Sequence, residues 1–287
     1  MVCYIILHYQ VEDETINCVN QLNKIDGEHK IIIVDNCSPN GSGKRLSERY
    51  ENVSNVDVIL HEKNDGFARG NNVGCKYAKE KYNPDFYVVM NNDIEITQND
   101  FESLIYRIYD ETNFDVLGPD IYSTSAKVHQ SPKSLRRTSL EDAERLLHKY
   151  EKKCKSKVIV PLRCYLKKIN ILKVIKKNAD RKKMNINPNV QYNNVPLHGS
   201  CVIFSNEFLN NRENAFFTNT FFYYEMEILD YECQIDEKRE VYDPRIKVLH
   251  HQNVSTNVTY SNELKRVRFM NDQNYKSIKA FLSKFNV

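Results

Sequence analysis

The chain has 287 residues, of which 41% are hydrophobic and 28% are charged, and its formal net charge is +3. This composition is typical of a folded globular protein and excludes a wholly disordered chain. The first apolar run stops at Tyr9 without a basic region before it, and no run reaches the length of about 18 apolar residues that a membrane-spanning helix needs. We therefore expect a cytoplasmic protein, soluble or peripheral at the inner face of the cell membrane.

Eight cysteines are scattered along the sequence without any C-x-x-C pair, and several of them lie inside apolar runs. This distribution predicts reduced thiols in the core of a cytosolic protein. It does not fit a disulfide framework or a zinc site.

Residues 3–9, 30–34 and 56–60 are short apolar runs that predict buried strands. Each is followed by a segment long enough for a crossover helix, and residues 12–24 carry apolar residues near helical spacing. Repeated alternation of strand and helix is typical of an α/β fold with a parallel, doubly wound sheet. Polar residues that follow these strands, such as Asp35, should then open onto one edge of the sheet.

Residues 64–74 place three glycines and three asparagines around a predicted helix start. Glycine lets the backbone approach a ligand closely, and the amino terminus of a helix offers free N–H groups to an anion. The segment matches neither the Walker pattern nor the dinucleotide fingerprint. It therefore indicates either a ligand site or a flexible turn before a capped helix.

Residues 87–96 begin as another apolar run and end in Asn91, Asn92 and Asp93 before Ile94. Ligands of open α/β sheets bind beyond the carboxyl ends of the strands, so Asp93 is well placed to hold a cation. The alternative is a polar turn that caps the next predicted helix, residues 99–112.

Residues 133–183 form a basic block with 18 Lys and Arg against 5 Asp and Glu, a balance of +13, which leaves 3 − 13 = −10 for the rest of the chain. Such a block favours phosphates, either of anionic lipid or of nucleic acid. Apolar residues recur at helical spacing among the lysines of residues 162–175, which suits an interfacial helix or a solvated helical hairpin. Nucleic acid is the poorer choice because the block has no zinc-finger or RNP signature.

The last third of the chain begins with residues 195–205, a predicted strand entered through a Gly-Ser turn. In residues 221–230, aromatic side chains run into Glu225 and Glu227 at the head of a predicted helix. These acids either favour the positive end of the helix dipole or accept a proton from a sugar hydroxyl.

Residues 245–251 predict a final strand that ends in His250 and His251, followed by an amphipathic helix over about residues 260–285. A terminal histidine pair is either a surface feature or a source of metal ligands.

The order of these pieces resembles the family 2 glycosyltransferases of GT-A fold, most closely the bacterial rhamnosyltransferase-like and capsule or O-antigen branch. The resemblance covers residues 3 to about 125 and 195 to about 255. Its motifs are, in chain order, Asp35-Asn36, Asn64-x-Gly66-Phe67-Ala68-x-Gly70-Asn71-Asn72-x-Gly74, Asn91-Asn92-Asp93, Gly199-Ser200, Tyr224-Glu225 and His250.

The resemblance implies a Rossmann-like, mostly parallel sheet with helices on both faces. It further implies a nucleotide-sugar-binding half in residues 1–130, a basic helical insertion in 131–190, an acceptor-binding and catalytic half in 191–258, and a carboxy-terminal helix in 259–287.

For the donor, the resemblance implies that Asp35 binds the uracil or thymine and the ribose of a UDP- or dTDP-sugar. Asp93 stands where the family's D-x-D motif has its last aspartate, although this chain has Asn91 at the first position, and it would hold Mn²⁺ or Mg²⁺ together with His250. The residues expected to help bind the donor are Asn36, Asn64, Gly66, Phe67, Arg69, Asn71, Asn72, Asn91 and Asn92. The residues expected at the acceptor are His198, Gly199, Ser200 and Tyr224.

For catalysis, the resemblance implies a general base on the helix after the aromatic run. The family usually has two consecutive acids there, whereas this chain has Met226 between Glu225 and Glu227. The base is therefore Glu225 or Glu227, and we favour Glu225. The chain also lacks the family's Gly-Gly-Phe-Asp segment and has Asn-Asn-Arg-Glu-Asn at residues 210–214.

The resemblance thus implies an inverting, metal-dependent glycosyltransferase that moves a sugar to a hydroxyl of a bacterial surface glycan carried on a lipid diphosphate. Residues 133–183 would contact an anionic membrane, and no nucleic acid partner is expected. One alternative is a nucleotide-sugar pyrophosphorylase, although residues 8–13 contain no Gly-rich loop with Arg and Lys. The other is a non-catalytic protein that binds a nucleotide sugar or a glycan.

Overall fold

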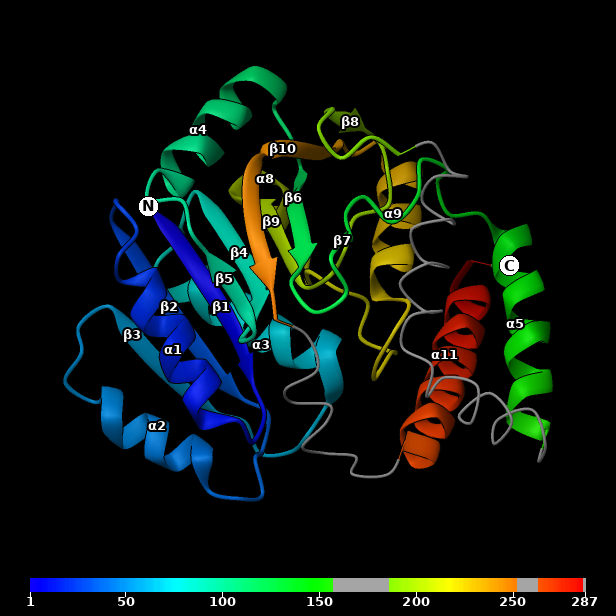
Figure 1. Ribbon diagram of the computed structural model, residues 1–287, viewed down its shortest axis with the longest axis horizontal. Helices are drawn as coiled ribbons and strands as arrows, with labels where there is room; N and C mark the ends of the chain where they lie inside the picture. The colour runs from blue at the N-terminus through cyan, green and yellow to red at the C-terminus, as the bar shows by residue number, and fades with distance from the viewer. Residues whose placement is uncertain (157–185, 252–262, 286–287) are drawn as a thin grey trace.

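Ten strands in the described part of the chain form a single sheet with helices on both faces (Figure 1). The computed structural model describes residues 1–156, 186–251 and 263–285. The strands are β1 (Val2–His8), β2 (His29–Asp35), β3 (Val56–Leu60), β4 (Phe86–Asn91), β5 (Ile94–Ile96), β6 (Val116–Ser123), β7 (Val128–His129), β8 (Tyr192–Asn193), β9 (Cys201–Ser205) and β10 (Glu240–His250). The helices are α1 (Glu12–Leu22), α2 (Ser42–Tyr50), α3 (Gly66–Lys81), α4 (Phe101–Thr112), α5 (Leu140–Lys155), α8 (Asn206–Asn210), α9 (Glu225–Ile235) and α11 (Glu263–Phe285).

The strand order is β3-β2-β1-β4-β9-β6-β10-β5, with β7 beside β6 and β8 beside β10. The first four strands in this order are parallel to their neighbours, and β6 is parallel to β10. Strand β9 runs antiparallel between β4 and β6, and β5 runs antiparallel to β10. This arrangement confirms the predicted α/β fold with a mostly parallel sheet.

Alternation along the buried strands divides the core into two layers, one on each face of the sheet. On β1, Val2, Tyr4 and Ile6 belong to one layer, which α1, α2 and α4 complete. Cys3 and Ile5 face the other layer, which α3, α8 and α9 complete. Because both faces are covered, these strands are apolar throughout, as the sequence pattern predicts.

A third apolar cluster joins α9 to α5 and α11, which lie side by side beyond it (Figure 1). Ile228 of α9, Ala143 of α5 and Ile278 of α11 are all buried there. Helix α5 begins at Ser139, whose side chain accepts a hydrogen bond from the backbone N–H of Asp142 as a helix cap. The two helices thus extend the second core layer away from the sheet.

The structure differs from the sequence-based expectation at the end of β4. The predicted run of residues 87–96 breaks after Asn91, and β5 turns to pair with β10. Asn92 and Asp93 therefore lie at a bend between two strands. The cysteine prediction was wrong for Cys37 and Cys154, which are exposed, although all seven described cysteines are free.

The predicted helical pattern of residues 162–175 and the start of the last helix, residues 260–262, lie outside the described residues, as does Cys164. Among the helices that the structure describes, none combines the length and the apolar character needed to cross a bilayer.

Candidate active site

Three polar residues, His8, Asp35 and Asn91, lie together at the carboxyl ends of the central parallel strands. His8 on β1 is in register with Asp35 on β2, and Leu7 on β1 is in register with Asn91 on β4. The predicted sheet edge therefore exists, and Asp35 and Asn91 both lie on it.

Asp35 is 5% exposed, and its carboxylate is held by the turn into α2. Both carboxylate oxygens lie 3.2 Å from the backbone N–H of Ser38, which donates to them. A Cβ atom at Gly43 would lie only 2.0 Å from Oδ2 of Asp35, so glycine is required for α2 to begin this close. The local sequence thus fixes the position of the carboxylate.

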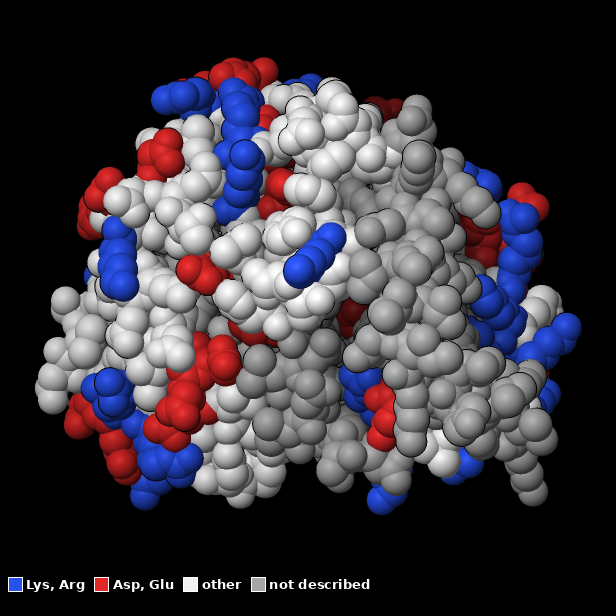
Figure 2. Space-filling model, in the orientation of Figure 1, with Lys and Arg blue, Asp and Glu red and all other residues white. Residues whose placement is uncertain are grey.

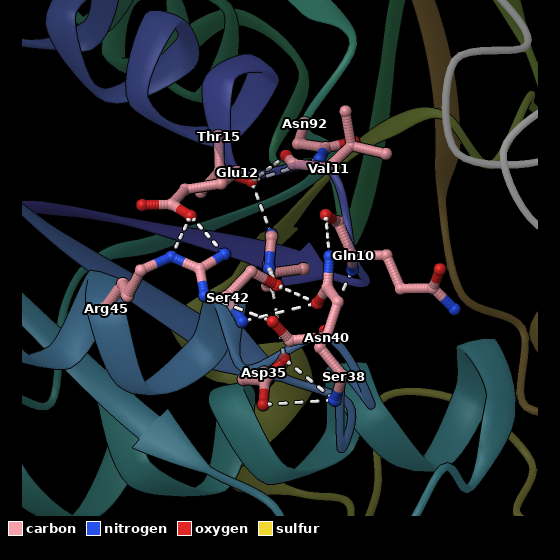
Figure 3. A network of polar contacts seen from close by, with 11 residues as sticks. Gln10, Val11, Glu12, Thr15, Asp35, Ser38, Asn40, Ser42, Arg45 and Asn92 are labelled. Carbon is pink, nitrogen blue, oxygen red and sulfur yellow. Dashed lines mark hydrogen bonds and ion pairs between the residues drawn. The ribbon is translucent and has the colours of Figure 1, made fainter.

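A chain of hydrogen bonds runs from the end of β1 to the end of β4 (Figure 3). His8 Nδ1 lies 2.7 Å from Thr15 Oγ1 and His8 Nε2 lies 2.8 Å from Ser42 Oγ, while Asn92 Nδ2 donates to Thr15 Oγ1 at 3.0 Å. His8 Nε2 is also 4.0 Å from Asp35 Oδ1. Burial lowers the pKa of His8, so its ring is neutral at physiological pH. This network ties Asp35 to Asn92, the residue before Asp93.

The predicted donor residues Asn36, Asn64 and Gly66 meet beside Asp35. Asn36 Nδ2 donates to Asn64 Oδ1 at 3.0 Å and to the carbonyl of Gly66 at 3.1 Å, and Asn36 Oδ1 accepts from the backbone N–H of Asp65. The other predicted donor residues of α3 are placed differently. Arg69 and Asn72 contact residues 216–221, as detailed below.

Two further predicted donor residues make contacts nearby. Asn71 Nδ2 donates to the carbonyl of Phe67 within α3, whereas Asn71 Oδ1 is buried without a hydrogen-bond partner. The backbone N–H of Asn91 donates to the carbonyl of Ser200 at 2.9 Å, which brings the predicted acceptor turn against the end of β4.

Asp93 and His250, far apart in the chain, lie side by side. His250 ends β10, and its Nε2 is 3.3 Å from Oδ1 of Asp93. The backbone N–H of His251 donates to the carbonyl of Asp93 at 3.0 Å, which locks the two strand ends together. His251, the second histidine of the pair, lies 2.7 Å from Glu95.

The chemistry of this pair fits a divalent cation. Oδ1 of Asp93 is buried, accepts no hydrogen bond and lies 3.3 Å from His250 Nε2, so either a proton on that nitrogen or a bound cation would satisfy it. His250 Nδ1 lies 2.8 Å from Gln130 Oε1, and donation to that oxygen leaves Nε2 as the unprotonated ring nitrogen. No group of three or more His, Cys, Asp or Glu suited to a metal occurs in residues 1–156, 186–251 and 263–285, so Asp93 and His250 offer two ligands.

Glu225 and Glu227 both lie in the first turn of α9, but their surroundings differ. Glu225 is 7% exposed, its Oε1 accepts no hydrogen bond, and burial raises its pKa to about 7. The charge of Glu227 adds to this shift and that of Lys133 opposes it. Glu227 Oε1 instead accepts a hydrogen bond from Lys133 Nζ at 2.6 Å in a partly exposed ion pair. Glu225 is thus the buried acid without a cationic partner, and Glu227 the paired one.

The turn at residues 198–200 lies between the Asp93–His250 pair and these acids. The ring centroids of His198 and His250 are 6.0 Å apart. A Cβ at Gly199 would lie 2.9 Å from Cγ of Met226, the residue between the two acids. The side chain of Ser200 contacts His198 Nδ1 at 3.0 Å. The 198–200 turn therefore contacts His250 on one side and the first turn of α9, which carries both acids, on the other.

Tyr224, the remaining predicted acceptor residue, does not contact the 198–200 turn through its ring, which packs against α11. It is 8% exposed, and its ring packs on Phe281 of α11 with centroids 5.6 Å apart.

Four residues of this region were missed from the sequence: His8, Thr15, Gln130 and Lys133. His8 could have been found, because it ends a predicted buried strand beside the one that ends in Asp35. Gln130 and Lys133 follow β7 in an irregular segment; Lys133 was noted only as the first cation of the basic block, and no pattern marks Gln130.

Comparison with known proteins matches this geometry to a family and to solved structures. The sequence model of glycosyl transferase family 2 matches residues 3–170, more than half of the chain. The hexosyltransferase Agl10 of low-salt glycan biosynthesis in Haloferax volcanii is 30% identical over 131 residues, which are 45% of this chain and 39% of the relative. Rhamnosyltransferase WbbL of Escherichia coli K12 is 30% identical over 108 residues, 37% of this chain and 39% of the relative. The matched regions thus span about two fifths of these relatives' own length.

Solved structures share the fold at low sequence identity. S. aureus TarS 1–349 superimposes with a TM-score of 0.54 at 14% identity, over 99% of this chain and 72% of that chain. Mannosyltransferase PcManGT from Pyrobaculum calidifontis, in complex with GDP-Man and Mn²⁺, gives a TM-score of 0.53 at 10% identity. The superposition covers 99% of this chain and 74% of that chain. These likenesses confirm the predicted GT-A fold. The match of the family model over residues 3–170 shows that the chain belongs to glycosyl transferase family 2.

Proposed function

We propose that this protein transfers a sugar from a nucleotide-sugar donor to an acceptor hydroxyl with inversion at the anomeric carbon. The observation that carries the proposal is that Asp93 and His250 lie side by side, and that the 198–200 turn contacts both His250 and Met226, the residue after the buried acid Glu225. A site for the leaving diphosphate and a group that can take the acceptor proton are the two requirements of this reaction.

The proposed donor is a UDP- or dTDP-sugar bound at the carboxyl edge of the sheet, with its nucleoside near Asp35 and Asn36. TarS has been solved with UDP and with UDP-GlcNAc, and PcManGT with GDP-Man and Mn²⁺, which supports a nucleotide sugar as donor. Asp93 and His250 would hold Mn²⁺ or Mg²⁺. When bound, such a cation stabilises the negative charge on the departing nucleoside diphosphate.

Glu225 is the proposed general base. A carboxyl with a pKa of about 7 is half deprotonated near neutral pH, and it holds a proton more strongly than an ordinary glutamate. It would take the proton of the acceptor hydroxyl, whose oxygen then attacks the anomeric carbon from the face opposite the leaving diphosphate. Glu227 is already engaged in an ion pair with Lys133, which makes it the weaker candidate.

The acceptor that we propose is a glycan hydroxyl on a lipid diphosphate, handled by residues 191–258, with residues 1–130 binding the donor. The basic insertion, residues 131–190, would face an anionic membrane. Not all of its cations are available for this role: Lys133 pairs with α9, and Arg137 bridges the buried acids Asp230 and Glu240 at 2.8 and 2.6 Å. Figure 2 shows Lys and Arg side chains along the edge formed by α5, whose last turn carries Lys152, Lys153 and Lys155.

A thermal-shift screen of UDP-, dTDP- and GDP-sugars with and without Mn²⁺ tests the donor site, because a ligand of the folded state raises the melting temperature by mass action. We expect a shift that depends on Mn²⁺ for a uridine or thymidine donor, followed by sugar transfer to a lipid-linked acceptor. Binding without any transfer or donor hydrolysis would instead support a non-catalytic binding protein.

The membrane surface is tested separately by flotation with liposomes of different charge. We expect binding to vesicles that contain anionic lipid and its loss at high salt, because the attraction of lysines to the surface falls off within a Debye length. Equal binding to neutral and anionic vesicles would refute this part of the proposal.

A further inference from the structure

The start of α3 is fastened to a distant loop, residues 216–224, that leads directly into Glu225. Asn72 makes the most complete contact. Its Nδ2 donates to the carbonyl of Phe216 at 2.7 Å, and its Oδ1 accepts from the backbone N–H of the same residue at 2.9 Å. The side chain is 7% exposed, so one amide satisfies both backbone groups of Phe216 in a buried position.

Three more residues of the first two turns of α3 contact this loop. Arg69 Nε donates to the carbonyl of Thr218 at 2.7 Å, and the backbone N–H of Phe67 donates to the carbonyl of Phe221 at 2.8 Å. Gly66 has φ +79°, and a Cβ there would lie 2.1 Å from the carbonyl oxygen of Phe221. We call the contacts of Gly66, Phe67, Arg69 and Asn72 with residues 216–221 the α3 clasp.

The loop held by the α3 clasp carries backbone strain just before Glu225. Tyr223 and Tyr224 are consecutive residues with φ of +70° and +73°, in the left-handed region that bulky residues avoid. Such a conformation persists only where surrounding contacts determine it. On the other side, Ser277 of α11 donates to the carbonyl of Phe222 at 3.0 Å. The direction in which Glu225 enters the site therefore depends on contacts that flank the loop.

The other end of the α3 clasp reaches the donor edge. The carbonyl of Gly66 accepts a hydrogen bond from Asn36, next to Asp35, while the N–H of Phe67 is bonded to the loop. One short segment of backbone thus contacts the predicted nucleoside site and the approach to the base.

We propose that Asn72 and Arg69 are positioning residues for Glu225, acting through the 216–224 loop, and that they do not bind the donor. The inference rests on the proposed function, in which Glu225 is the base. Its physical content is that both polar atoms of the Asn72 side chain are bonded to Phe216, and that Nε of Arg69 is bonded to Thr218 while its Nη1 lies 3.8 Å from Asp65.

The test compares Asn72→Asp with the matched control Asn206→Asp. Asn206 Nδ2 also fastens a loop, through Asn83 and the carbonyl of Pro84 at 2.9 and 2.7 Å, but that loop does not lead to Glu225. Asn72→Asp keeps the shape and loses the donor to Phe216. We expect hydrogen–deuterium exchange of residues 216–225 to become at least about tenfold faster, because the loop loses a buried anchor. In the control, only residues near 83–85 should exchange faster.

Binding and turnover then separate positioning from donor recognition. In Asn72→Asp, the Kd of UDP with Mn²⁺ should stay within about twofold of wild type, while kcat with the donor and acceptor found by the screen falls at least about tenfold, since small displacements of a reacting group are expensive. The acid limb of the pH–rate profile should also move to lower pH as Glu225 becomes more exposed.

Two results would overturn the inference: unchanged exchange in residues 216–225, or a tenfold weaker Kd for UDP with unchanged kcat. If the wild type transfers no sugar, the proposed function fails. The exchange data and the pH dependence of unfolding of Asn72→Asp still decide whether the α3 clasp holds Glu225 in its buried position.

Discussion

The two ends of the candidate active site differ in how completely the protein satisfies their polar groups. Around Asp35, the carboxylate accepts from Ser38, both ring nitrogens of His8 have hydroxyl partners, and the amide of Asn36 bonds at both of its atoms. Toward the acceptor side, Asp93 and Glu225 each keep a buried carboxylate oxygen that accepts no hydrogen bond.

This difference separates a rigid support from a reactive region. An unsatisfied buried polar group costs about 1–3 kcal/mol, so it is retained where a ligand or a proton completes it. The contacts around Asp35 hold its carboxylate and the Asn36 amide in place before any ligand binds, whereas Oδ1 of Asn71, another predicted donor residue, has no hydrogen-bond partner. The unsatisfied end is where a cation and a proton are expected, and the predictions that follow test this contrast from the largest effect to the smallest.

Replacing Asp93 should have the largest effect. Asp93→Ala removes a proposed cation ligand at the unsatisfied end, and we expect Mn²⁺-dependent binding of UDP to be abolished in isothermal calorimetry. Asp120→Asn is the matched control, because Asp120 is a buried sheet carboxylate whose two oxygens contact His129 at 2.8 and 2.9 Å. Undiminished metal-dependent binding in Asp93→Ala would remove the cation site from the proposal.

Glu225→Gln and Glu227→Gln together test which acid is the base. We expect Glu225→Gln to lower kcat by about 10²–10⁴-fold with donor binding retained, the range typical of a lost general base. Glu227→Gln should lower kcat by less than about tenfold. In the wild type, kcat should fall as the pH drops below about 7, because the base must be deprotonated. A larger loss in Glu227→Gln than in Glu225→Gln would reverse the assignment.

Gln130 should affect the affinity for the cation indirectly, through its contact with His250. Gln130→Leu removes the acceptor for His250 Nδ1, and loss of such a partner typically weakens metal affinity about 10–100-fold. Gln130→Glu restores an acceptor oxygen and should recover most of the affinity. Titration of Mn²⁺ in the presence of UDP measures both variants, and equal affinities in Gln130→Leu and wild type would contradict this role.

The smallest expected effect is on the free energy of unfolding. With rising pH this stability should fall, whereas kcat should rise. The pKa of Glu225 rises from an ordinary value of 4.5 to about 7 on folding, so the folded state binds more protons between these values and stability is lost as the pH rises through them. Glu225→Gln removes this penalty. Its free energy of unfolding should exceed that of wild type by up to about 3 kcal/mol at pH 8, and by little at pH 4.

Denaturant titrations at the two pH values measure this difference. A gain in stability that is the same at pH 4 and pH 8 would show that Glu225 does not titrate abnormally in the folded protein.

Much of the fold follows from local sequence, because strands buried on both faces are continuous apolar runs and their polar carboxyl ends mark one edge. Asp35, Asp93 and His250 were therefore predictable as residues of that edge. The choice between Glu225 and Glu227 was not, since it depends on Lys133, which approaches from a segment more than ninety residues earlier in the chain.

The glycine and asparagine segment shows a second limit of sequence reasoning. Its composition indicates that something approaches the backbone closely, and this is true at Gly66. The approaching group, however, is the backbone of Phe221. A glycine indicates that another group approaches the backbone closely, but it does not identify that group.

The order of strands has a consequence for how this enzyme can be divided. Strand β6, from the amino-terminal part of the chain, lies between β9 and β10 from the carboxy-terminal part, and β5 pairs with β10. A fragment ending near residue 130 would leave β6 paired only with the two-residue strand β7, and β5 without its partner. Residues 1–130 are therefore not expected to fold as an autonomous unit. A chimera that exchanges acceptor specificity would have to include β9 and β10. These two strands would then have to pair with β6 in the sheet of the recipient protein.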